Sequence, residues 1–133
     1  AVLMPIVASM GGNAGTQTMT VAVRAIATRE LTASNALRVC WREITVGAIN
    51  GFAFGLLMAL VAGLWFGVPM LAAVIAVAML LTLIAAALGG ILIPIVLDKL
   101  KIDPALASGP FVTTVTDVIG FFAFLGLASA VLL

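Results

Sequence analysis

The sequence has little charge and no histidine. Of its 133 residues, 8% are charged and 65% are hydrophobic, whereas a soluble domain carries about 25% charged residues. The net charge of +1 provides no basic patch for nucleic acid, and the single cysteine excludes a disulfide within the chain. Without histidine the chain lacks the usual general base and the commonest ligand of soft metals. Any metal handled here is therefore expected to be a hard cation bound through oxygen.

Long apolar runs predict an all-α, polytopic membrane bundle. Residues 44–97 carry no charged side chain, and this length is enough for two spans of about 20 residues each. A membrane β-barrel would instead show short alternating strands. We expect four transmembrane helices, over residues 2–27, 43–66, 69–97 and 104–132.

Ten of the eleven charged side chains fall in two clusters, residues 24–43 and 98–103. Four arginines against two glutamates place the first cluster in the cytoplasm by the positive-inside rule. Two expected spans separate it from the second cluster, which therefore lies on the same face, and the two lysines there agree with that placement. We expect residues 28–43 to be an interfacial linker, with Leu31, Leu37 and Trp41 against the membrane surface. Asp103 precedes Pro104, which predicts a helix N-cap.

Small residues recur at every fourth position of the second expected helix, and such a seam lets another helix approach closely. They are Gly47, Gly51, Gly55, Ala59, Gly63 and Gly67. In the third expected helix, Gly89, Gly90 and Pro94 predict a bend.

Asp117 is the one charged residue outside the clusters, in the middle of the last apolar segment. An isolated ionisable group in a membrane segment is costly and suggests a function. Three interpretations compete. A salt bridge with Arg24 is disfavoured because Arg24 lies at the end of its helix, whereas Asp117 lies near the midplane. A protonated, hydrogen-bonded aspartate or proton relay is the second. The third is a cation site in a water-filled path.

Oxygen-bearing residues surround Asp117 in the sequence. Thr113, Thr114 and Thr116 supply hydroxyls, and Pro110 leaves the Leu106 carbonyl without its helical donor. Such a site suits Mg²⁺, which is often held through its waters. The residues expected on the same helical face as Asp117 include Leu106, Pro110, Thr113, Thr114 and Gly120.

A continuous polar stripe runs along the first expected helix. Its members are Ser9, Asn13, Thr16, Gln17, Thr20 and Arg24, with Gly11, Gly12 and Gly15 largely off it. Side chains of this kind form hydrogen bonds between helices in many membrane proteins. Six polar side chains on one face, ending in an arginine, fit a water-lined path better than hydrogen bonds between helices.

Two runs resemble the MgtE family of magnesium transporters and their eukaryotic relatives. Residues 5–17 read PIVASMGGNAGTQ, similar to the family's signature, and residues 103–105 (DPA) with 113–120 (TTVTDVIG) resemble its last helix. The resemblance covers essentially the whole chain. It implies a homodimeric Mg²⁺ channel, with Co²⁺ and other divalent ions as lesser substrates. It also implies a five-helix membrane domain, of which this chain carries the second to fifth helices without the cytoplasmic sensing domains.

In the family the second and fifth helices line the pore. The resemblance therefore implies that Asp117 corresponds to the family's pore aspartate and that Asn13 faces the same pore. The expected function is thus divalent-cation conduction by a non-enzymatic membrane protein in contact with lipid. Two alternatives stay open. One is a proton- or sodium-coupled transporter that uses Asp117 as its coupling carboxylate. The other is a non-conducting scaffold held together by the glycine seam.

Overall fold

The computed structural model describes residues 3–32 and 34–132, and four long helices contain most of these residues. The helices are α1 (Met4–Ala27), α2 (Ala36–Phe66), α3 (Pro69–Lys99) and α4 (Pro104–Leu132). The described residues contain no β-strand. The predicted all-α bundle is therefore confirmed. Predicted ends for α1, α3 and α4 agree within two residues, except that residue 2 lies outside the described residues.

The predicted start of α2 was wrong. Residues 36–43, expected to belong to a linker along the membrane surface, form the first two turns of α2. The Val39 N–H already donates to the Asn35 carbonyl at 3.0 Å. Arg38 and Arg42 therefore mark the edge of the apolar region and not the start of the helix, because helical hydrogen bonds continue through charged residues. The connection between α1 and α2 shrinks to residues 28–35.

Three of the helices are long and apolar enough to cross a membrane, namely α2, α3 and α4. With 24 residues, α1 is ~36 Å long at 1.5 Å per residue, against a hydrocarbon core of about 30 Å. Its polar stripe lowers its apolar content, which explains why it differs from the other three. It packs on α3 and α4, so it is the fourth helix of the same bundle.

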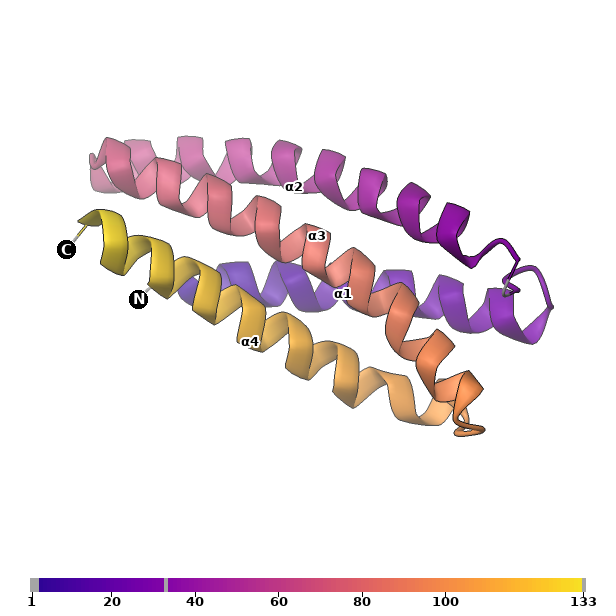
Figure 1. The fold of residues 1–133 in the computed structure, drawn as a ribbon. Helices are drawn as coiled ribbons and strands as arrows, with labels where there is room; N and C mark the ends of the chain where they lie inside the picture. The colour runs from indigo at the N-terminus through magenta and orange to yellow at the C-terminus, as the bar shows by residue number, and fades with distance from the viewer. Residues whose placement is uncertain (1–2, 33, 133) are drawn as a thin grey trace.

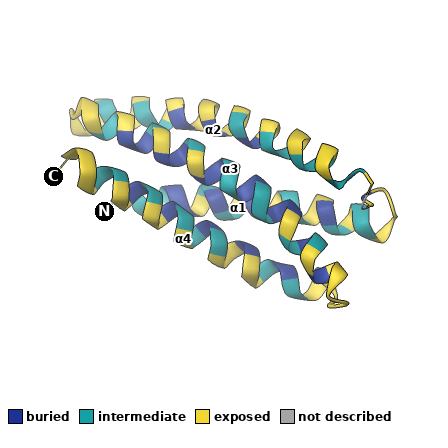
Figure 2. Ribbon diagram, in the orientation of Figure 1, coloured by how far each residue is buried: buried dark blue, intermediate teal, exposed yellow. Residues whose placement is uncertain are grey.

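The centre of the bundle is α3, which packs against each of the other helices. Figure 2 shows α3 buried along most of its length, whereas the outward side of α2 is exposed. In Figure 1 the connections after α1 and α3 lie at one end, and both termini lie at the other end with the α2–α3 turn. The two charged clusters therefore share one end of the molecule, as predicted.

The glycine seam of α2 lies against α3. A methyl group added at Gly55 would lie 2.9 Å from the Ala76 carbonyl oxygen, and one added at Gly47 would lie 2.9 Å from the Leu83 carbonyl oxygen. A methyl group added at Gly51 would lie equally close, 2.9 Å from the Leu80 Cα. Because no side chain fits in these places, the predicted close approach is confirmed.

Local capping fits the sequence at two helix ends. Gly67 ends α2 with a φ of 66°, a left-handed conformation that favours glycine. The Ala105 N–H donates to Asp103 Oδ1 at 3.0 Å, which confirms Asp103 as the cap of α4. The connection differs from expectation at Leu31. It is buried with Ala22 and Ile91 and does not lie against the membrane surface.

Candidate functional site

Asp117 lies near the middle of α4, as its fourteenth residue and ~20 Å from the start of the helix at 1.5 Å per residue. It is partly buried. Among residues 3–32 and 34–132, Arg42 and Glu43 form the only ion pair, at 3.8 Å. Arg24 therefore makes no ion pair with Asp117, as the difference in depth predicts.

The threonines near Asp117 divide into two groups. Thr113 and Thr114 are exposed. The Thr114 hydroxyl donates to the Pro110 carbonyl at 2.7 Å, so its oxygen lone pairs stay free to accept from water. Thr116 is fully buried, and its hydroxyl donates to the Thr113 carbonyl at 3.0 Å. Including Thr116 in the oxygen-rich surroundings was therefore wrong, because its hydroxyl faces the packed interior.

The polar stripe of α1 lies on its exposed side. All six predicted members are exposed, namely Ser9, Asn13, Thr16, Gln17, Thr20 and Arg24. The glycines behave differently, because Gly11 and Gly15 are buried against the neighbouring helices. A methyl group added at Gly11 would lie 2.6 Å from Thr82 Cγ2, and one at Gly15 would lie 2.9 Å from Val112 Cγ1. The glycines therefore bring α1 close to α3 and α4 and leave its polar side free.

Contacts between α1 and α4 place the stripe level with Asp117. A methyl group added at Gly12 would lie 4.0 Å from Thr116 Oγ1, and one added at Gly120 would lie 3.5 Å from the Ala8 Cα. The two helices thus run antiparallel, with Gly12 beside Thr116. Asn13 and Asp117 are each one residue from this contact, in opposite directions along the bundle, so their heights differ by only about 3 Å at 1.5 Å per residue.

Three other predicted residues of α4 have different surroundings. Leu106 is 81% exposed and Pro110 is also exposed, so the outer surface of α4 continues from Asp117 toward the charged end. Gly120 is buried, and a methyl group there would also lie 3.5 Å from Thr82 Cγ2. Within one chain, Gly120 serves the packing of α4 on α1 and α3.

Gln17 also borders a cavity that the sequence did not indicate. The cavity measures about 190 Å³, and its polar lining residues include Gln17 and Thr18 of α1 with Glu43 and Asn50 of α2. Glu43 and Asn50 are seven residues apart, so they lie on one side of α2. That spacing was the available signal, because the helix expected over residues 43–66 already contained both residues.

One chain offers one carboxylate at the centre of the site. The residues that the structure describes contain no group of three or more His, Cys, Asp or Glu side chains able to hold a metal. A carboxylate with nearby hydroxyls suits an ion that keeps most of its waters, as Mg²⁺ does. It does not suit an ion that needs a full cage of protein ligands.

A membrane helical bundle with a polar stripe and a mid-membrane carboxylate has the features of a transport domain. The chain belongs to the MgtE family of divalent cation transporters, which it matches over residues 4–127. It is 38% identical over 130 residues to the magnesium transporter MgtE of Bacillus subtilis, and 40% identical over 129 residues to that of Enterococcus faecalis.

A third relative, the magnesium transporter MgtE of Thermus thermophilus, is 36% identical over 129 residues. Each comparison covers 97–98% of this chain but only 28–29% of the relative. The chain therefore spans less than a third of the length of the curated relatives that it matches.

Proposed function

We propose that this chain is the conducting membrane domain of a transporter whose substrate is Mg²⁺, with Co²⁺ and other divalent ions as lesser substrates. The observation that carries the proposal is the Asp117 carboxylate, unpaired within the described chain and level with the polar stripe of α1. The three relatives compared with this chain are magnesium transporters by name. Transport needs no covalent chemistry, so the chain is proposed as a non-enzyme.

The pore is proposed to form between two copies of the chain. One carboxylate carries one negative charge, half of what balances a divalent cation. Two Asp117 side chains facing each other across a homodimer would balance it. The exposed sides of α1 and α4 are then the two walls contributed by each copy.

A hydrated ion would meet a graded set of oxygens along these walls. On α4, Thr113, Thr114 and the Leu106 carbonyl are proposed to accept hydrogen bonds from the ion's waters. On α1 the corresponding groups are Ser9, Asn13, Thr16, Gln17 and Thr20. Mg²⁺ loses water reluctantly, so these contacts would guide the hydrated ion, and the carboxylate pair would supply the electrostatic attraction at the midplane.

The charged end of the bundle is proposed to face the cytoplasm, because the connections at residues 28–35 and 100–103 carry arginine and lysine. The shares covered in the comparisons support a longer natural protein. We propose that it also contains a further membrane helix and cytoplasmic magnesium-sensing domains.

Flux measurements test the proposal. The intact protein is reconstituted in vesicles, and Mg²⁺ entry is followed while membrane potential, pH gradient and sodium gradient are set independently. Entry should follow the potential and the Mg²⁺ gradient, and Asp117→Ala should abolish it without changing dimer assembly. Asp98→Ala, which removes an exposed carboxylate at the charged end, is the matched control. Entry that requires a proton or sodium gradient would favour a coupled transporter instead.

A further inference from the structure

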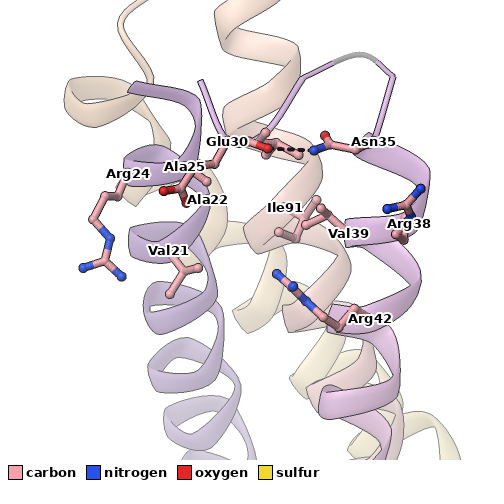
Figure 3. A pocket seen from close by; sticks show the side chains of 11 residues that line it. Val21, Ala22, Arg24, Ala25, Glu30, Asn35, Arg38, Val39, Arg42 and Ile91 are labelled. Carbon is pink, nitrogen blue, oxygen red and sulfur yellow. Dashed lines mark hydrogen bonds between the residues drawn. The ribbon is translucent and has the colours of Figure 1, made fainter. Parts of the chain in front are cut away.

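A second polar cavity lies at the charged end of the bundle, remote from Asp117 along the helices. It measures about 250 Å³ and lies between α1, the connection at residues 28–35 and the first turns of α2 (Figure 3). Three of the chain's four arginines line it, namely Arg24, Arg38 and Arg42, whereas Arg29 does not. Ile91 of α3 contributes to its apolar part.

The cavity has an excess of positive charge. Glu30 is the only carboxylate in its lining. In Figure 3 Arg42 reaches from α2 into the space toward α1, whereas Arg24 extends away from that space on the far side of α1 and Arg38 lies at the outer side of α2. Within the described chain, Arg24 and Arg38 make no ion pair, and Arg42 makes only the long contact of 3.8 Å with Glu43. The Arg42 guanidinium therefore has donors available for an anion in the space between α1 and α2.

Hydrogen bonds hold the wall of this cavity in place. The Asn35 side-chain amide donates to the Glu30 carbonyl at 2.7 Å, drawn as a dashed line in Figure 3, and its oxygen accepts from the Thr32 N–H at 2.8 Å. Leu31 is buried beneath the connection. These contacts hold Asn35 beside Glu30 and Thr32 at the edge of the cavity, which is thus a built feature of the chain.

The neighbouring side chains place the cavity at the membrane surface. Leu37 and Trp41, on the same two turns of α2 as Arg38, are 73% and 63% exposed. Tryptophan is enriched at the level of lipid headgroups. Since α1 and α2 both pack on α3 and make little contact with each other, the space between them is accessible from the side of the bundle.

We propose that this cavity binds the phosphate group of an anionic phospholipid. Basic pockets between transmembrane helices bind anionic headgroups, and the arginine fork matches phosphate oxygens in a bidentate geometry. The volume lies below the ~300 Å³ at which pockets for whole small ligands begin, so it suits a headgroup whose acyl chains stay in the bilayer. The apolar side chains of Val21, Val39 and Ile91 complete the lining.

Native mass spectrometry of the detergent-solubilised intact protein tests this, with phosphatidylglycerol as the probe and phosphatidylcholine as the neutral comparison. The double variant Arg38→Gln/Arg42→Gln should weaken phosphatidylglycerol binding about tenfold or more. The reason is that hydrogen bonds between charged groups contribute more to the free energy of binding than hydrogen bonds between neutral groups. Arg29→Gln removes one positive charge from the adjacent connection outside the cavity, and it should change the affinity less than about twofold.

The variant Arg38→Lys/Arg42→Lys keeps both charges but removes the planar forks, and it should bind with intermediate affinity. Equal loss in Arg29→Gln and the cavity variant would overturn the proposal, because general surface charge would then explain binding. Competition by millimolar inorganic phosphate as effective as by the lipid would also overturn it, in favour of a soluble anion. Lipid binding that appears only after proteolytic removal of a cytoplasmic segment would assign the cavity to an acidic part of the protein instead.

Discussion

The contact between α2 and α3 makes a quantitative prediction for Gly55→Ala. The added methyl group would lie 2.9 Å from the Ala76 carbonyl oxygen and 3.5 Å from its Cα. These are backbone atoms, so relief requires the two helices to separate. Overpacking of this kind costs about 1–3 kcal/mol, while replacing glycine by alanine in a helix gains about 1 kcal/mol. We expect a net loss of about 1 kcal/mol in the free energy of unfolding.

Gly63 provides a matched control in the same seam. Its added methyl group would lie 3.5 Å from Ala72 Cβ, an ordinary van der Waals distance. Gly63→Ala should therefore be neutral or stabilising by up to about 1 kcal/mol. The two variants are compared by pulse proteolysis in mixed micelles of increasing SDS content. If Gly55→Ala is as stable as Gly63→Ala, the close backbone approach between α2 and α3 does not exist.

Two further predictions concern α4. Thr113→Val changes an exposed threonine of the proposed path and should lower Mg²⁺ flux severalfold. Thr116→Val should leave flux nearly unchanged, because the Thr116 hydroxyl is buried and bonded within the helix. Equal effects of the two variants in the vesicle assay would remove Thr113 from the path. Asp103→Ala deletes the side-chain cap at the Ala105 N–H and should cost about 1 kcal/mol of stability. Asp98→Ala should cost less in the same unfolding assay, and the reverse order would contradict the capping role.

Much of the fold follows from patterns along the chain. Apolar length places α3 and α4 to within two residues, because a membrane helix must satisfy its own backbone and cross a layer of known thickness. The spacing of Gly47, Gly51 and Gly55 likewise predicts a close helix contact. Helix length beyond the apolar region is less predictable. For α2, the first two turns contain Arg38 and Arg42, and the positions of these charges do not show where the helix begins.

The choice of partner for each helix face could not be read from the sequence. A small-residue seam shows that a neighbour comes close but does not name it, and here α3 fills the seam of α2. Helical periodicity groups Gly120 with Asp117 on one face of α4. That face is exposed before Asp117 but buried at Gly120, which lies beside Ala8 and Thr82. Where a helix face changes surroundings within one turn, residue spacing alone cannot separate packing from exposure.

We propose that Asp117 forms half of a symmetric ion site. It is tested most directly by an experimental structure of the intact protein in lipid, determined with Mg²⁺ and again with a chelator. We expect a dimer with the two Asp117 carboxylates facing each other across its axis. Density for a hydrated ion should lie between them, with waters about 2.1 Å from the metal, and it should disappear with the chelator. Asp117 side chains that face lipid or separate cavities, with no ion between them, would exclude a shared ion site.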